Sequence, residues 1–213
     1  MKSKISGQYF DEFPVSADSE NSFTLSIDGN DFRFVTNSGI FSGKKADFGS
    51  CLLIENYIKD RRKGMDTGRD VLDLGCGYGL IGIVIKRIFP DTCVTMADIN
   101  TRAAGYAQMN AELNVSGEAD IIVSDGSASI NRKFDTVLLN PPVRAGKKIV
   151  FRLYSEVKAM LREEGKFYIV IQTKQGAASS AKELERLFGI CEVIDISAGY
   201  RVFRCTKEKQ EEV

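Results

Sequence analysis

The stretch V-L-D-L-G-C-G-Y-G-L-I-G, residues 71–82, decides the fold. It begins as a short apolar run typical of a buried strand. Three glycines then follow at alternate positions, Gly75, Gly77 and Gly79, before a helix-length segment. Glycines at this spacing let the backbone turn tightly and let a ligand lie against bare main chain near a helix N-terminus. A turn needed only for the packing of strand against helix is the alternative. We expect a ligand-binding loop at residues 73–80.

The same loop also matches the spacing G-x-G-x-x-G of dinucleotide-binding proteins, through Gly77, Gly79 and Gly82. This pattern is weak by itself. Asp73 argues against it, because Asp73 lies two residues before the first glycine and the strand ends at Gly75, ahead of the match. The G-x-G-x-x-G match nevertheless leaves a nicotinamide-dependent oxidoreductase open as an alternative function of a different class.

Short apolar runs alternate with helix-length segments through the rest of the chain. The strands are expected at 71–74, 93–98, 120–124, 135–140 and 166–172, and the helices near 79–89, 101–113, 149–163 and 177–188. Nearly continuous apolar runs are typical of parallel strands that are covered on both faces. The last two runs, 190–197 and 200–206, are too close for a crossover and should form an antiparallel hairpin. The sequence predicts an α/β fold with a doubly wound, Rossmann-like, mostly parallel sheet that ends in this hairpin.

The chain before this region follows a different pattern. Alternating apolar residues from Phe23 to Phe34, with a turn at Gly29-Asn30, predict a β-hairpin, and residues 49–64 have the apolar spacing of a helix. We therefore predict three parts: an N-terminal hairpin and helix extension (1–64), a core (65–206) and a charged tail (207–213).

The composition excludes several kinds of chemistry. The chain has 213 residues and no histidine, which removes Ser-His-Asp triads, Cys-His pairs and histidine-containing zinc sites. Its five cysteines, Cys51, Cys76, Cys93, Cys191 and Cys205, form no C-x-x-C pair, so we expect core thiols in a reducing cytosol. No apolar run approaches the ~18 residues of a membrane helix, which predicts a soluble, cytoplasmic protein without a membrane partner. The lack of histidine and of C-x-x-C pairs predicts that no metal is bound. The 29 basic residues balance 29 acidic ones, so contact with nucleic acid requires a local basic patch.

Polar residues follow the second and third predicted parallel strands. Asp98, with Ile99 and Asn100 after it, is placed to accept both hydroxyls of an adenosine ribose, although a helix N-cap is the alternative. The segment Ser124-Asp125-Gly126 follows the third strand. Its carboxylate can accept the adenine amine, but S-D-G is also a common turn. Ligands bind at the carboxyl ends of the strands in such sheets, so we expect these residues to share a site.

The fourth predicted strand ends in Asn140-Pro141-Pro142-Val143. Pro141 fixes its own φ and favours an extended Asn140, which predicts a rigid arc at the ligand edge of the sheet. The Asn140 side-chain oxygen and the Pro141 carbonyl can together accept both hydrogens of an exocyclic amine. The alternative interpretation is that the two prolines only end a loop and bind no ligand.

Together these motifs resemble the class I S-adenosylmethionine-dependent methyltransferases, with D-L-G-C-G-Y-G as the glycine loop, Asp98 as the ribose acid and N-P-P-V as the amino-methyltransferase motif. More narrowly, F-S-G-K-K-A-D-F-G-S, N-P-P-V-R-A-G-K, V-I-Q-T-K-Q-G-A and G-Y-R-V resemble small-subunit ribosomal RNA guanine-N2 methyltransferases of the short single-domain branch. The resemblance spans roughly residues 20–206. It implies S-adenosylmethionine as cofactor, ribosomal RNA or the small ribosomal subunit as partner, and methylation of a guanosine N2 amine in 16S ribosomal RNA.

The motifs and the resemblance imply three groups of site residues and no metal ligand. The catalytic group is Asn140, Pro141 and Pro142; the cofactor-binding group is Asp47, Gly49, Asp73, Gly75, Cys76, Gly77, Gly79, Leu80, Asp98, Ile99, Asn100, Ser124, Asp125 and Gly126; the substrate-binding group is Val143, Arg144, Lys147, Lys148 and Tyr200.

One residue departs from the family pattern. Members that act on nucleobases often have an aromatic residue after N-P-P, against which the base stacks, and this chain has Val143 there. Tyr200, Tyr154 and Phe41 are the candidates to replace it.

A basic patch is expected beside the arc. The basic residues between positions 132 and 152 face a single acid, Asp135; they are Arg132, Lys133, Arg144, Lys147, Lys148 and Arg152. Such a patch favours contact with RNA phosphates over a solvated helix start. Adenine N6 and a protein glutamine amide stay open as other acceptors, and a non-catalytic cofactor-binding module stays open as a third class, although the intact Asn140 argues against it.

Overall fold

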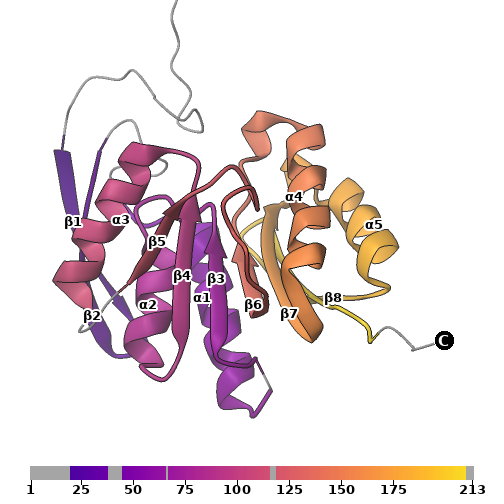
Figure 1. Cartoon of the computed structure of the whole chain (residues 1–213), viewed down its shortest axis with the longest axis horizontal. Coiled ribbons are helices and arrows are strands. Elements are labelled where there is room, and N and C mark those ends of the chain that lie inside the picture. Colours follow the sequence, from indigo (N-terminus) through magenta and orange to yellow (C-terminus); the bar gives the residue numbers. More distant parts are fainter. Residues whose placement is uncertain (1–19, 38–44, 66, 116–118, 210–213) are drawn as a thin grey trace, which may run out of the picture.

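The computed structural model describes residues 20–37, 45–65, 67–115 and 119–209, and a seven-stranded sheet lies at its centre (Figure 1). The strands of this sheet are β3 (Asp70–Leu74), β4 (Cys93–Asp98), β5 (Asp120–Val123), β6 (Phe134–Leu139), β7 (Leu161–Gln172), β8 (Ile190–Ser197) and β9 (Tyr200–Thr206). Their order is β5-β4-β3-β6-β7-β9-β8. The first five strands in this order are parallel, and β9 is antiparallel to both β7 and β8. The predicted doubly wound sheet with a terminal antiparallel hairpin is confirmed.

The order of the strands locates the ligand edge. Strand β3 lies between β4 and β6, so the chain direction across the sheet reverses beside β3. The carboxyl ends of these three strands meet at one edge, where crevices between diverging connections bind ligands in this class of sheet. Strand β5 ends at the same edge, next to β4.

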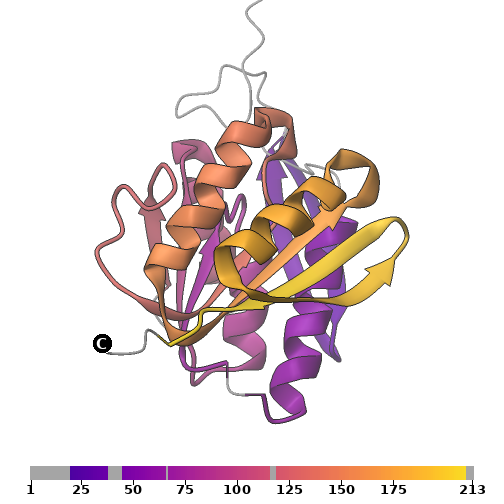
Figure 2. The same cartoon turned by 90° about the vertical axis from the view of Figure 1, so that its right-hand side faces the viewer.

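Helices cover both faces of the sheet and complete a three-layer arrangement (Figures 1 and 2). Helices α1 (Phe48–Arg62), α2 (Leu80–Ile88) and α3 (Thr101–Asn114) lie on one face, and α4 (Lys147–Met160) and α5 (Ala177–Phe188) lie on the other. Short 3-10 turns, η1 (Val143–Ala145) and η2 (Thr173–Gln175), follow β6 and β7. Each face buries its own apolar cluster. Within the described residues no helix is long and apolar enough to cross a bilayer.

The predicted N-terminal hairpin consists of β1 (Glu20–Ile27) and β2 (Asn30–Asn37). Its turn residues are Asp28 and Gly29, with φ of 55° and 73°, one residue earlier than predicted. Two positive φ values define the type I′ turn that matches the twist of a hairpin, and Asp followed by Gly suits it better than Gly followed by Asn.

Two asparagines of α3 fix this hairpin to the core. The Asn110 side chain bonds the backbone N–H and C=O of Val35, each at 2.8 Å, and Asn114 bonds the same two groups of Arg33. Asn110 Nδ2 also donates to the carbonyl of Tyr78 in the glycine loop, at 2.9 Å. Helix α1, in contrast, packs directly on β7 and β9. The boundary placed at residue 64 stays a prediction.

Two sequence predictions in the C-terminal half need correction. Helix α4 runs from Lys147 to Met160 and not from 149 to 163, because Leu161 is already extended and begins β7. Strand β7 begins at Leu161 and not at residue 166, so it is longer than predicted. It includes Glu164, which has a φ of 63°, and Gly165, where a Cβ atom would lie 2.8 Å from the Arg162 carbonyl oxygen.

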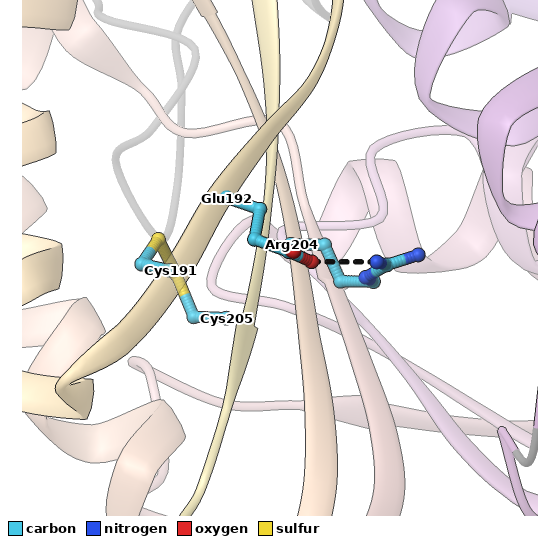
Figure 3. The surroundings of a disulfide bond; sticks show 4 residues. All are labelled: Cys191, Glu192, Arg204 and Cys205. Atoms are coloured by element: carbon cyan, nitrogen blue, oxygen red, sulfur yellow. Dashed lines mark hydrogen bonds and ion pairs between the residues drawn. A yellow bond between two sulfur atoms is a disulfide. The ribbon is translucent and has the colours of Figure 1, made fainter.

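The cysteine prediction was wrong for one pair. Cys191 and Cys205 are cross-strand partners on β8 and β9 and form a disulfide, beside the ion pair of Glu192 and Arg204 (Figure 3). Cys51, Cys76 and Cys93 are free thiols, and Cys93 is exposed and so is not part of the core.

Candidate active site

A cavity lies at the carboxyl edge of β3, β4, β5 and β6 and receives residues from the start of α1. It brings together fourteen of the predicted site residues: Asp47, Gly75, Cys76, Gly77, Leu80, Asp98, Ile99, Asn100, Ser124, Asp125, Gly126, Asn140, Pro141 and Pro142. The other predicted residues do not line it; they are Gly49, Asp73, Gly79, Val143, Arg144, Lys147, Lys148 and Tyr200.

The glycine loop forms the floor of the cavity. Gly75, Gly77 and Gly79 have positive φ values of 69°, 56° and 90°, which residues with a Cβ adopt only under strain. A Cβ atom on Gly77 would meet nothing within 4 Å, so the loop presents bare main chain to open space there. A Cβ atom on Gly79 would lie 2.8 Å from Ile83, so this glycine serves the packing of α2. The predicted loop therefore has two roles: Gly77 exposes main chain to the cavity, and Gly79 allows α2 to pack closely.

Asp98 ends β4 and joins the loop to the next helix. Its carboxylate accepts the Gly77 N–H and the Asn100 N–H, both at 2.8 Å. Burial raises the pKa of Asp98, while these backbone donors oppose the rise. The N-cap of α3 is Asn100, which accepts from Arg102 N and Ala103 N, so Asp98 does not cap the helix. The carboxylate also accepts the Ile99 N–H. Since a carboxylate has about four acceptor positions, Asp98 keeps acceptor capacity for a diol such as a ribose.

Asp73 lies behind the loop and not in the cavity. Its side chain is fully buried, Oδ2 accepts the Gly82 N–H at 2.9 Å, and Oδ1 has no partner. Burial raises the pKa of Asp73 to about 7, and the neighbouring Asp98 adds to the rise. Its position fits a residue that ties β3 to α2 beneath the loop.

The Ser124-Asp125-Gly126 segment borders the cavity next to Asp98. Ser124 Oγ donates to the Gly126 carbonyl at 2.8 Å and accepts the Ser129 N–H, so its hydroxyl holds the turn. Asp125 Oδ1 accepts from Arg152 at 2.6 Å, which leaves Oδ2 for a ligand donor.

Asn140 follows β6 and is held by the start of α1. Its Nδ2 donates to Asp47 Oδ2 at 2.8 Å and to Ser50 Oγ at 2.9 Å. Asp47 is the N-cap of α1 and accepts the Ser50 N–H through the same Oδ2, at 2.8 Å. A carboxylate only accepts, so the amide nitrogen and not the amide oxygen must face Asp47. The amide orientation is thus fixed by its neighbours.

The two prolines give the predicted arc a defined shape. Pro142 has φ −74° and ψ 72°, the conformation of an inverse γ-turn, and the Pro141 carbonyl accepts the Val143 N–H at 2.8 Å. The Pro142 carbonyl accepts the Ala145 N–H at 2.8 Å, which begins η1. Both carbonyls therefore hold the turn and keep one lone pair each.

The predicted basic patch is divided by the sheet. Arg132 and Lys133 precede β6 and lie at its amino end, away from the arc, where Arg132 pairs with Asp120. Arg152 bridges Asp125 and Glu156. The predicted extent of the patch was therefore wrong, because strand β6 separates Arg132 and Lys133 from the arc. Arg144, Lys147 and Lys148 remain beside the arc.

The candidate stacking residues differ in their positions. Tyr154 is fully buried and bonds Ser180 at 3.0 Å, so it is not available to a substrate. Phe41 lies outside the described residues, and Tyr200 is half-buried at the start of β9.

Several cavity residues were not predicted. They are Ser50, Leu74, Tyr78, Ile81, Ala103, Leu139, Ala145, Ile149, Arg152 and Leu153. Most are apolar residues that a local pattern does not distinguish from the core. Ser50 carries a usable signal, because it stands three residues after a capping Asp.

Comparison with known proteins identifies the family of the chain. The family described as Methyltransferase small domain matches residues 31–204. The Bacillus subtilis (strain 168) protein named "Uncharacterized protein YbxB" is 36% identical over 205 residues, which are 95% of this chain and 100% of that protein. The ribosomal RNA large subunit methyltransferase G of Photobacterium profundum is 30% identical over 182 residues, 82% of this chain and 46% of that protein.

A solved structure of a methyltransferase is also similar to this chain. The T. thermophilus 16S rRNA N2 G1207 methyltransferase (RsmC), in complex with AdoMet and guanosine, matches with a TM-score of 0.77 at 26% identity, over 92% of this chain and 52% of that chain. The present chain thus spans about half the length of these two ribosomal RNA methyltransferases. The nicotinamide-dependent oxidoreductase is excluded by the family match. The chain belongs to the Methyltransferase small domain family of S-adenosylmethionine-dependent methyltransferases, in the branch that contains RsmC and the large-subunit methyltransferase G.

Proposed function

We propose that this chain transfers a methyl group from S-adenosylmethionine to the exocyclic N2 amine of a guanosine in small-subunit ribosomal RNA. The observation that carries the proposal is the fixed amide of Asn140. Both hydrogens of Nδ2 are used, by Asp47 and Ser50, so Oδ1 is the atom left for a substrate. An oxygen that only accepts selects a donor, and an amine is a donor.

The cavity fits the cofactor by its donor and acceptor chemistry. Asp98 would accept the ribose hydroxyls, the bare main chain at Gly77 would lie against the cofactor, and Asp125 Oδ2 would accept the adenine amine. Bound S-adenosylmethionine supplies an electrophilic methyl group on a positively charged sulfur. The remaining task of the chain is to position a nucleophile and to exclude water.

Asn140 Oδ1 and the Pro141 carbonyl would act on that nucleophile. The lone pair of a guanine amine is delocalised into the ring, which makes the nitrogen a poor nucleophile. Two acceptors that bind both N–H bonds favour a pyramidal nitrogen whose lone pair points across the site. The nitrogen gains positive charge as the new bond forms, so these hydrogen bonds strengthen in the transition state. The Pro141 carbonyl already accepts the Val143 N–H, and its second lone pair serves the substrate.

The start of α4 supports RNA as the substrate. Lys147 and Lys148 occupy its first turn, which has no acidic residue and no side-chain N-cap. Cations at this end oppose the helix dipole, and a phosphate bound beside them would relieve that repulsion. Among the residues that the structure describes, no ion pair involves Arg144 or Lys148. The side chains of Arg144, Lys147 and Lys148 lie beside the arc and would hold the RNA backbone.

Nucleoside mass spectrometry tests the proposal. Ribosomal RNA from cells without this gene should lack one N2-methylguanosine that is present with the gene, and the purified chain should restore it on small subunits or their RNA. Loss of N6-methyladenosine, or of methylglutamine in protein, would keep the arc and refute the acceptor.

Asn140→Ala tests the role of the amide. It should lower the single-turnover rate by about 10² to 10³, the usual effect of one preorganised polar group, with nearly unchanged cofactor affinity. Asn131→Ala, which changes an exposed asparagine at the other edge of the sheet, is the matched control. A folded Asn140→Ala protein with the parental rate would exclude catalysis through the arc.

A further inference from the structure

The proposed function leaves the target base without a stacking partner at Val143. This residue begins η1, and its side chain offers no ring. Tyr154 is buried, so it cannot replace the missing ring. An unpaired base needs a flat apolar surface beside the acceptor oxygen, since base–aromatic stacking is the usual way in which single bases are held.

An exposed aromatic ring follows Asp47, the residue that holds Asn140, on another element. Phe48 is the first residue of α1, directly after Asp47, and 46% of it is exposed. Its ring packs on Tyr200, with 5.5 Å between centroids and an angle of 46° between the planes. The Tyr200 ring supports one part of Phe48 and leaves the rest open to solvent.

The backbone at Gly49 joins this aromatic pair to the acceptor. A Cβ atom on Gly49 would lie 3.0 Å from Tyr200 Cε1 and 3.1 Å from Asp47 Oδ2. The same Asp47 oxygen accepts from Asn140 Nδ2 at 2.8 Å. The Tyr200 ring edge and the carboxylate that holds Asn140 therefore both contact one backbone position, and the pair borders the arc.

The exposure of Phe48 is unlike that of the other large apolar side chains. Single exposed apolar residues are normal on a protein surface. The other exposed large apolar residues of the described chain are aliphatic. Ile149 lines the cavity, Val123 precedes Ser124 at its border, and Ile196 lies across from Arg201 beside the start of β9. The remaining ones lie on other elements: Met109, Leu113, Ile190 and Val193. Within the described chain, Phe48 alone combines an aromatic ring, exposure and a position next to the residue that orients Asn140.

We propose that the target guanine stacks on Phe48, with Tyr200 fixing the Phe48 ring from the other side. The inference rests on the proposed function, and it deepens that function by assigning the base-stacking surface to the start of α1 in place of the residue after N-P-P. A purine on Phe48 lies next to Asn140 Oδ1, and Arg144 and Lys148 on the arc side are the cations for the flanking phosphates.

The absence of tryptophan from the chain provides a direct probe of stacking. Phe48→Trp introduces a unique fluorophore at the proposed surface, and Leu113→Trp introduces one at the exposed C-terminal end of α3 as the matched control. Each protein is titrated with a short single-stranded RNA that contains one guanosine, with S-adenosylhomocysteine present. We expect saturable quenching only of the tryptophan introduced at position 48, and this quenching should disappear when the guanine is replaced by an abasic site. Equal titration curves with the abasic RNA would overturn the proposal.

Affinity and rate give an independent readout. Phe48→Ala should weaken RNA binding by about 5- to 150-fold, the range for one lost stacking contact, while Phe48→Tyr stays near the parental affinity and S-adenosylhomocysteine binding is unchanged. Phe48→Leu keeps the apolar bulk and controls for folding. It should bind RNA as weakly as Phe48→Ala if stacking matters and as tightly as the parent if only packing matters, and the second result would overturn the proposal.

The two failures can be told apart. Parental RNA methylation with no dependence on residue 48 would overturn the stacking surface and keep the proposed function. A parent that binds and methylates no RNA would overturn the proposed function, and the stacking surface with it.

Discussion

Replacement of Asp47 by alanine should slow methyl transfer, because Asp47 holds the acceptor oxygen of Asn140 in place. The Asp47 carboxylate accepts from Asn140 Nδ2 at 2.8 Å, and hydrogen bonds to a charged group contribute ~1.5 to 3 kcal/mol. Without Asp47, Ser50 Oγ alone contacts the amide. A hydroxyl both donates and accepts, so it no longer decides which end of the amide faces the substrate. We expect the single-turnover rate to fall by about 10- to 100-fold, less than after Asn140→Ala.

The same substitution removes the N-cap of α1, so stability must be measured beside the rate. Loss of a cap costs ~0.5 to 2 kcal/mol. Asp47→Ser is the matched control, because serine is a good cap but is too short to reach Asn140. Urea unfolding should show that Asp47→Ser recovers most of the stability lost in Asp47→Ala, while its rate of methyl transfer remains low. Asp47→Asn keeps an accepting oxygen and should recover part of both.

A double-mutant cycle decides whether Asp47 acts through Asn140. If it does, adding Asp47→Ala to Asn140→Ala should cost almost nothing further in rate, since residues that act as a unit are not additive. If Asp47→Ala lowers the rate of the Asn140→Ala protein by the same factor as it lowers the rate of the parent, the positioning role is refuted. A weaker affinity of Asp47→Ala for S-adenosylhomocysteine would favour instead the cofactor-binding role that the family resemblance implies.

Three further predictions concern the cofactor, the core and the RNA. Asp98→Ala should weaken S-adenosylmethionine binding by roughly 10- to 100-fold in calorimetry, and unchanged affinity of the folded variant would remove Asp98 from the ribose site. Burial raises the pKa of Asp73 to about 7 from 3.8, so between these values the cofactor-free native chain binds more protons than the unfolded chain. Asp73 should therefore lower the free energy of unfolding by about 2 kcal/mol from pH 5 to pH 7, and Asp73→Asn should remove this contribution; an equal slope of the variant and the parent in urea unfolding would contradict it. Lys148→Ala should reduce the salt slope of RNA binding by about 0.7, whereas Lys182→Ala on α5 should not; equal slopes would mean a solvated face.

The parallel core could be predicted because its sequence signals are local. Each run between Val71 and Gln172 is apolar on both faces, and the segments between runs are long enough for crossovers. Parallel strands put all their carboxyl ends on one edge. For this reason residues as distant as Asp98 and Asn140 could be expected to line one cavity from spacing alone.

The disulfide could not be predicted, because it depends on a bulge. The two-residue turn at Ala198 and Gly199 sets a register that, continued along the hairpin, would oppose Cys191 to Thr206. A register shift between Val193 and Asp195 moves the pairing by one residue and opposes Cys191 to Cys205. Bulges are inserted by local twist and packing, and no residue type in I-C-E-V-I-D-I-S marks the place.

The orientation of Asn140 was equally out of reach of a local pattern, although it explains the residue type. The N-P-P motif identifies an acceptor, and an aspartate would also accept. An aspartate at this position would face the Asp47 carboxylate at hydrogen-bond distance, and two carboxylates so close cannot both be ionised. An asparagine gives its two hydrogens to Asp47 and Ser50 and keeps a neutral oxygen for the substrate. The requirement for asparagine at 140 is therefore set by a residue 93 positions earlier, which only the folded chain brings beside it.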